Sequence, residues 1–131
     1  MKKTLCIFMI ALTAASYGQK QDEMTTFDPS FVHTVFFWLH NPDNQNDRAA
    51  FEASLSKFLG KSGYAKTKFI GTPPKASRDV VDGSFTYSLV LSFDSPEAQQ
   101  AYQDEQPHKD FIAESEHLWK KVIVYDSRGI R

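Results

Sequence analysis

Apolar side chains recur at every second position in several short segments of this chain, which is the pattern of β-strands. The first of these segments, residues 31–39, is β-branched and aromatic almost throughout and ends at the turn signal Pro42 and Asp43. A period of two places His33 among the apolar side chains of one face and Trp38 on the other. Neither face is polar, so we expect both faces to be covered in the folded protein.

Three further segments have strand patterns: residues 64–70, 85–93 and 121–125. Between the second and third strands, residues 71–83 form a connection that is long for a hairpin. This loop is either a mobile flap at the rim of a cavity or a tolerated surface insertion.

Two regions between the strands have the apolar spacing of helices. The first helix carries apolar residues from Phe51 to Leu59, and Asn46 or Asp47 is its predicted cap. A second helix is predicted to begin after Ser95 and to be interrupted at Pro107. The helical segment that follows has one inner side, made of His108, Phe111, Ile112, Ser115 and Trp119.

The order of elements predicts an α+β fold of the ferredoxin-like βαββαβ type. Its four-stranded antiparallel sheet has the first and third strands in the centre and both helices on one face. The uncovered face would then expose the apolar side chains of Val32, Phe36, Trp38, Val90, Ile123 and Tyr125. Such a patch predicts a homodimer that closes sheet against sheet through this open face.

The N-terminal residues of the chain predict export. Residues 1–18 have the layout of a signal peptide, with Lys2 and Lys3 before an apolar run and small residues before a cut at Gln19. The alternative is a buried N-terminal helix, which the polar residues after Gly18 disfavour. We therefore expect a periplasmic or extracellular protein with a polar tether at 19–30, a domain at 31–127 and a tail at 128–131.

The charge and the cysteine content limit the classes of function that we expect for this chain. Removing 18 of the 131 residues leaves 113, with 13 basic and 16 acidic side chains and no cysteine. A mildly acidic domain without a basic run predicts neither nucleic-acid binding nor attachment to a membrane after signal removal. The four histidines form no HxH or HxxxH pair, so we expect no metal site, and nothing in the sequence calls for a cofactor.

The candidate chemistry lies at one end of the predicted sheet. Antiparallel pairing brings His33 and Asp126 to the same end, both on the helix-covered face, with Tyr102 and His108 on the helices above. A carboxylate fixes the tautomer of an imidazole, and a phenol can donate to a developing enolate oxygen. The predicted ligand pocket is lined by Tyr87, Phe51, Leu55, Leu89, Phe111 and Trp119.

Purely structural roles are open for the same residues. His108 follows Pro107 and can simply satisfy backbone groups at a helix start, and His33 can be a hydrogen-bonded core residue. Tyr87 and Tyr102 can be core aromatics whose hydroxyl groups are tethered. Trp119 can serve packing alone.

The chain resembles the stress-responsive A/B barrel (Dabb) family of the dimeric α+β barrel superfamily. The resemblance rests on the opening strand 32–36, the strand 87–93 with its continuation 94–97, the run 102–111 and the closing segment 119–126. It implies a small homodimer with a cavity between helices and sheet.

One branch of that family, the plant polyketide cyclases, is similar in its working residues. Its Tyr and His pair corresponds to Tyr102 and His108, and its strand histidine and last-strand aspartate correspond to His33 and Asp126. Tyr87 stands where those cyclases have another histidine.

The sequence therefore supports three functions. The first is an exported homodimer that binds a small, largely apolar or phenolic ligand. The second is a lyase or cyclase with a His and Tyr acid–base pair. The third, by analogy within the superfamily, is a cofactor-free monooxygenase.

Overall fold

In the computed structural model, which describes residues 30–130, four strands form one antiparallel sheet in the order β2-β3-β1-β4. The strands are β1 (Phe31–Leu39), β2 (Lys68–Gly71), β3 (Tyr87–Phe93) and β4 (Trp119–Arg128). The two most apolar strands, β1 and β3, are central, as the sequence predicts. The expected signal peptide and nearly all of the expected tether lie outside the described residues.

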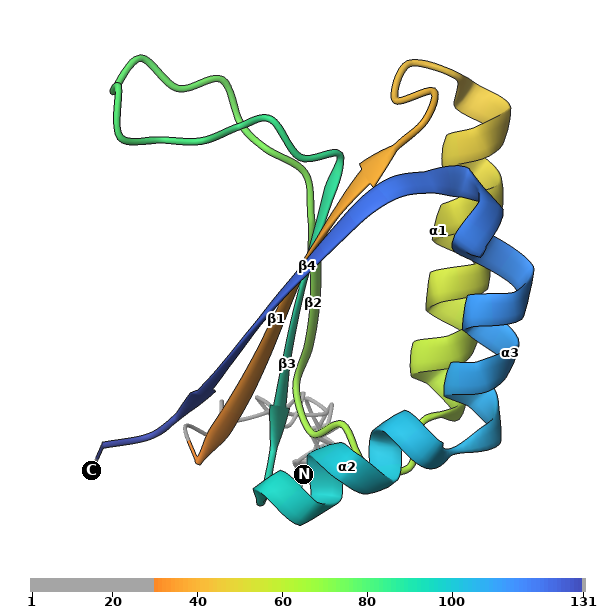
Figure 1. The fold of residues 1–131 in the computed structure, drawn as a ribbon, viewed down its shortest axis with the longest axis vertical. Coiled ribbons are helices and arrows are strands. Elements are labelled where there is room, and N and C mark those ends of the chain that lie inside the picture. The colour runs from red at the N-terminus through yellow and green to blue at the C-terminus, as the bar shows by residue number, and fades with distance from the viewer. Residues whose placement is uncertain (1–29, 131) are drawn as a thin grey trace, which may run out of the picture.

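The helices all belong to one side of the sheet. They are α1 (Gln45–Lys61), α2 (Pro96–Asp104) and α3 (Gln106–Ser115), followed by a short 3₁₀ turn, η1 (Glu116–Leu118). Figure 1 shows α1 and α3 side by side on this side, with α2 across one end of the sheet. The ferredoxin-like fold is therefore confirmed, with the second crossover divided into two helices at Glu105, just before Pro107. None of the helices in the described region is long and apolar enough to cross a membrane.

The alternation of β1 gives the molecule its two faces. The odd-numbered residues of β1 are buried under the helices, whereas the even-numbered residues are half-buried on the other face. Beneath the helices, the core is dominated by aromatic and leucine side chains such as Phe51, Leu55, Leu89 and Phe93, which are at most 1% exposed. Burial of this apolar surface is what holds the helices on the sheet.

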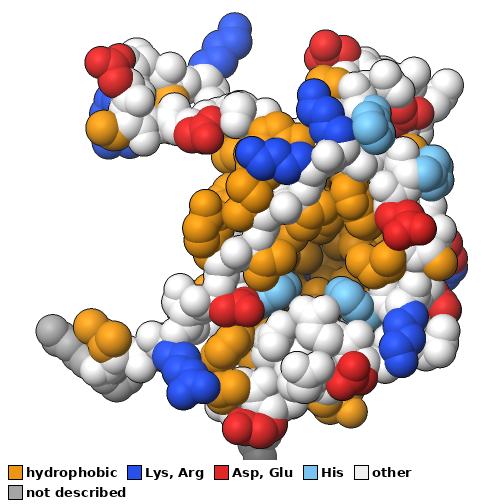
Figure 2. Space-filling model, in the orientation of Figure 1, with side chains coloured by type: hydrophobic (Ala, Val, Ile, Leu, Met, Phe, Trp, Pro, Cys, Tyr) orange, Lys and Arg blue, Asp and Glu red, His pale blue; other side chains and the backbone are white. Residues whose placement is uncertain are grey.

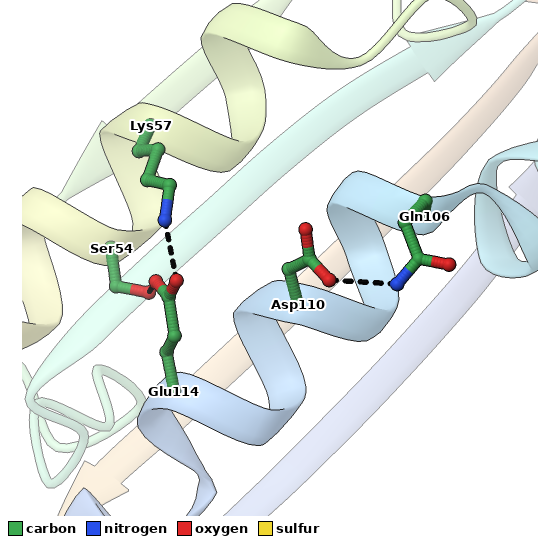
Figure 3. Close-up of polar contacts among 5 residues, drawn as sticks. All are labelled: Ser54, Lys57, Gln106, Asp110 and Glu114. Carbon is green, nitrogen blue, oxygen red and sulfur yellow. Dashed lines mark hydrogen bonds and ion pairs between the residues drawn. The ribbon is translucent and has the colours of Figure 1, made fainter.

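Polar contacts fix α1 against α3. The Glu114 carboxylate accepts a hydrogen bond from Ser54 Oγ at 3.0 Å and pairs with the Lys57 ammonium group. Gln106 Nε2 donates to Asp110 Oδ1 within α3 at 2.7 Å (Figure 3). Because Lys57 and Glu114 are exposed, their pairing between the two helices adds little to the stability of the fold.

The long loop between β2 and β3 projects away from the helices. Its two limbs, residues 72–74 and 83–85, lie close together, since a Cβ placed at Gly83 would be 3.5 Å from Pro73 Cβ. Figure 1 shows this loop standing out on the side of the sheet that carries no helix. Trp38 Nε1 donates to Ser84 Oγ at 3.1 Å and the Phe36 and Phe85 rings are 4.8 Å apart, so the base of the loop is tied to the uncovered face.

Several boundaries differ from those predicted. The second strand is shorter than the expected 64–70, because Lys66 and Thr67 bond to a single residue, Ser92, instead of extending the regular ladder. The third strand begins at Tyr87 and not at residue 85. The last strand runs on to Arg128, which pairs with Phe31, so Arg128 is part of the sheet and not of a tail.

Candidate functional site

A cavity of about 360 Å³ lies between the sheet and the helices. The strands supply its floor, α2 and α3 supply its roof, and the side chains of the edge strand β4 border it. Val122 and Val124 of β4 are 37% and 47% exposed although they lie on the helix-covered face, because the cavity opens beside this edge. Figure 2 shows the hollow, with hydrophobic side chains around it and histidine side chains at its lower margin.

One end of the cavity carries a histidine–aspartate pair. His33 is 3% exposed, and its Nδ1 lies 2.6 Å from Asp126 Oδ1. The register places these two residues directly opposite one another on β1 and β4. An ionised carboxylate only accepts hydrogen bonds, so the Nδ1–H group of His33 is the donor of this pair.

Tyr102 and His108 complete this polar end. The centre of the Tyr102 ring is 5.8 Å from that of His33 and 5.1 Å from that of His108, so the phenol contacts both imidazoles. Burial and, secondarily, the neighbouring His33 lower the pKa of His108, while a hydrogen bond with the Gln103 backbone opposes this shift. Burial raises the pKa of the Tyr102 hydroxyl, so the phenol stays protonated at neutral pH.

The opposite end of the cavity is aromatic. The Trp119 indole packs against Phe37 and Phe111, with ring centres 5.3 and 5.6 Å away. Trp119 begins β4, because η1 ends the helical segment on which the sequence placed it. It nevertheless faces the cavity because β4 contains a bulge: Trp38 is opposite Lys121 and Leu39 is opposite Trp119, so Lys120 is the additional residue. The bulge reverses the alternation and turns Trp119 to the same side as Val122.

This arrangement can hold a flat apolar molecule and offer a hydrogen-bonding group at one end of it. A neutral imidazole with a carboxylate partner can accept a proton, and a buried phenol can donate a hydrogen bond to an oxygen. Within residues 30–130, no group of three or more His, Cys, Asp or Glu side chains is arranged to hold a metal ion.

Comparison with known proteins shows the family of this chain. The model of the stress-responsive A/B barrel domain family, Dabb, matches residues 31–128. This chain belongs to the Dabb family.

Solved structures share the fold of this Dabb domain. A Dabb protein with a ferredoxin-like fold from Mesorhizobium loti has a TM-score of 0.65 at 17% identity, over 77% of this chain and 97% of that one. A hydroxynitrile lyase from Passiflora edulis has a TM-score of 0.64 at 21% identity, over 77% of this chain and 94% of that one. A dimeric ferredoxin-like protein of unknown function from Thermobifida fusca has a TM-score of 0.60 at 17% identity, over 75% and 89%. A comparison with curated proteins gives no match.

The structure of this Dabb domain brings together His33, Asp126, Tyr102 and His108, the four residues singled out for chemistry. Of the predicted pocket lining, Leu89, Phe111 and Trp119 face the cavity. His40 and His117 are exposed and lie away from the cavity wall.

Phe51, Leu55 and Tyr87 do not line the cavity, which corrects the predicted pocket. Phe51 and Leu55 are fully buried in the layer between α1 and the sheet. The Tyr87 ring stacks on Phe51 with 4.9 Å between centres, and its hydroxyl donates to the Glu52 carboxylate. These side chains fill the space under α1, whereas the cavity lies toward α3 and β4.

The prediction also missed part of the wall. Strand parity could have identified four of the missing residues, because they share a face with His33 or Asp126: Val35, Phe37, Val122 and Val124. Gln103 and Glu116 are polar residues near helix ends, and no spacing in the sequence marks them as cavity residues. Helical spacing predicts only that Ile112 lies on the inner side of its helix, and the structure places it in the cavity wall.

Proposed function

We propose that this Dabb protein is an exported homodimer that binds a small, largely apolar ligand in the cavity between helices and sheet. The observation that carries the proposal is the cavity itself, with aromatic walls and hydrogen-bonding side chains gathered at one end. A cavity volume on the order of 300 Å³ or more with few polar groups is typical of small-molecule sites.

The uncovered face of the sheet supports the homodimer. Phe36, Ile123 and Tyr125 lie on this face, and Tyr125 is 58% exposed. Apolar side chains gathered on one face favour association with a second surface of the same kind. The solved structure from Thermobifida fusca is described as dimeric, which is in keeping with this proposal.

Native mass spectrometry of the protein purified from its own host tests the proposal directly. We expect a dimer whose subunits lack residues 1–18 and which retains a small molecule. Subunits of full length would contradict export, and a strictly monomeric species at micromolar concentration would contradict the homodimer.

A blocked cavity provides the matching test of ligand binding. Val124 lines the cavity from the exposed edge strand, so Val124→Trp fills the opening with little disturbance of the core. Val80→Trp, on the loop and 87% exposed, is the matched control. We expect the retained molecule to be lost from Val124→Trp alone. Its retention in both variants would place the ligand elsewhere.

A lyase or cyclase of the polyketide cyclase type is the second candidate. It is favoured by the contacts of Tyr102 with both imidazoles and by the Asp126 partner of His33. In this function His108 is the base, and Tyr102 and Asp126 assist it. The neighbour from Passiflora edulis, described as a hydroxynitrile lyase, shows that a lyase can have this fold.

The base of this second function can be tested by NMR titration of the His108 imidazole. We expect a pKa below the ordinary histidine value, because the ring is partly buried and close to His33. An ordinary pKa together with unchanged ligand affinity in His108→Ala would remove the base and with it the enzymatic function.

A further inference from the structure

The cavity wall is poor in charge. Among the described residues that line the cavity there is no lysine or arginine, and Glu116 carries the one side chain with a formal charge at neutral pH. The other lining residues are aliphatic, aromatic, amide or imidazole groups. A ligand inside the cavity therefore meets no permanent positive charge in the wall.

The polar end of the cavity is also without a permanent cation. The titratable groups around His108 are His33 on β1, Tyr102 on α2, and Glu105 between α2 and α3. His33 is paired with the Asp126 carboxylate, so a positive charge on this imidazole would be balanced within the pair and would not be free to pair with a ligand anion. The pKa of His108 is lowered by burial and by His33, which keeps this ring neutral at physiological pH.

This distribution separates two kinds of ligand head group. A carboxylate would lose part of its hydration in the cavity and would lie near the Asp126 and Glu116 carboxylates without a lysine or arginine as partner, which is costly. A ketone, aldehyde or hydroxyl group of the same size is uncharged. It can accept a hydrogen bond from the Tyr102 hydroxyl or an imidazole N–H without that cost.

We propose that the cavity selects uncharged ligands, with a flat apolar body and a carbonyl or hydroxyl head group, and discriminates against carboxylates of the same shape. The proposal rests on the proposed ligand-binding function and names the chemical class of its ligand. The apolar body lies against Phe37, Phe111 and Trp119, and the head group lies at Tyr102 and His108.

A pair of isosteric probes tests this selection. 4-Butylacetophenone and 4-butylbenzoate have the same apolar body and the same number of heavy atoms in the head group, and they differ in charge. Near pH 7.5 we expect the ketone to bind at least about tenfold more tightly, as measured by isothermal titration calorimetry. The difference should narrow near pH 5.5, because His108 then takes up a proton more readily and can pair with the carboxylate.

A charge variant at the cavity tests whether the charge of the cavity wall, and not the net charge of the protein, determines the affinity for the benzoate. In Glu116→Gln we expect the affinity for 4-butylbenzoate to increase about twofold and the affinity for 4-butylacetophenone to stay constant, since only the benzoate is repelled by Glu116. Asp79→Asn, an exposed carboxylate on the loop, is the matched control and should change neither affinity.

The outcomes distinguish the inference from the function on which it rests. Equal or tighter binding of 4-butylbenzoate near pH 7.5 would overturn the charge selection and leave ligand binding in place. If neither probe binds to the wild-type protein, the ligand-binding function itself is contradicted.

Discussion

Two buried tyrosines of this Dabb domain have different surroundings, and their hydroxyl groups therefore have different roles. The Tyr87 hydroxyl donates to Glu52 under α1, and the Arg48 guanidinium group lies 4.8 Å from the centre of its ring. Tyr102 instead lies between His33 and His108 in the cavity wall. Tyr87 therefore stabilises the position of α1, and Tyr102 is part of the candidate site.

Replacing each tyrosine by phenylalanine separates these roles. Tyr87→Phe should lower the free energy of unfolding by about 1 kcal/mol, because Glu52 loses its donor, and should leave the affinity for 4-butylacetophenone unchanged. Tyr102→Phe should weaken that affinity by about three- to tenfold. Urea unfolding and calorimetric titration measure the two effects. The opposite assignment of the effects would show that Tyr87, and not Tyr102, contacts the ligand.

The stability of the domain should depend on pH through His108. Burial lowers the pKa of this imidazole in the folded protein below its ordinary value of 6.5, so the unfolded chain binds more protons as the pH falls through this range. The free energy of unfolding should therefore decrease between about pH 7.5 and pH 5. This decrease should be smaller in His108→Gln, whereas His117→Gln, an exposed control, should behave as the wild type. Equal slopes for wild type and His108→Gln would contradict the lowered pKa.

At the level of single residues, strand parity predicts which side chains share a face and an end of the sheet. Helical spacing does not predict which side chains line the cavity. Parity alone brings His33 and Asp126 to one end and one face, and the structure places them 2.6 Å apart. Phe51 and Leu55 have helical spacing that predicts burial, but the spacing does not say whether they face a filled layer or a cavity. That distinction depends on how α1 and α3 lie on the sheet.

The start of α1 illustrates how an element boundary is chosen among similar residues. Asn44, Asn46 and Asp47 are all good capping residues, and the apolar spacing favours the last two. In the structure the Asn44 side chain accepts hydrogen bonds from the backbone N–H groups of Asn46 and Asp47 at 2.9 and 3.2 Å. The helix therefore begins two or three residues earlier than the predicted caps at Asn46 or Asp47 indicate.

Alanine substitutions distinguish the cap from its neighbour. Asn44→Ala should lower the free energy of unfolding by about 1 kcal/mol, because two N–H groups in the first turn lose their acceptor. Asn46→Ala should leave stability unchanged or slightly higher, since alanine is the better helix former inside the first turn. Chemical denaturation of the two variants measures the difference. A larger loss in Asn46→Ala would move the cap to the predicted position.

The last strand shows a boundary that no local pattern marks. Trp119 has the helical spacing of the inner side of α3, yet it begins β4 after the η1 turn. Without the bulge at Lys120, strand parity would place Trp119 on the uncovered face with Ile123 and Tyr125. A single additional residue thus puts the indole in the cavity, which periodicity alone does not predict.

In the molecule as a whole, helices cover one face of the sheet and leave the other face uncovered. The predicted element order, the antiparallel pairing and the central position of β1 and β3 are all confirmed. These features follow from hydrophobic patterns that extend over complete elements. The course of the loop is not encoded in this way, because residues 72–84 have few apolar side chains and no repeating pattern.

A charge on the uncovered face should dissociate the proposed homodimer. Phe36 lies at the centre of this face, in ring contact with Phe85 and Tyr125. Phe36→Asp should shift the protein to a folded monomer and raise the dimer dissociation constant at least about a hundredfold, because the carboxylate would be buried between the sheets. Val80→Asp, on the exposed loop, is the control and should leave the dimer intact. Sedimentation velocity together with circular dichroism tests both variants, and a dimeric, folded Phe36→Asp would exclude this face as the interface.

The most direct test of ligand binding in the cavity is an NMR titration of the four imidazoles and two indoles with 4-butylacetophenone near pH 7.5. We expect the resonances of His33, His108 and Trp119 to shift, because these rings line the cavity. Those of the exposed His40 and His117 should stay in place, as should that of Trp38 on the opposite face. Shifts confined to His40, His117 or Trp38, or no shift in any ring, would contradict a ligand site between helices and sheet.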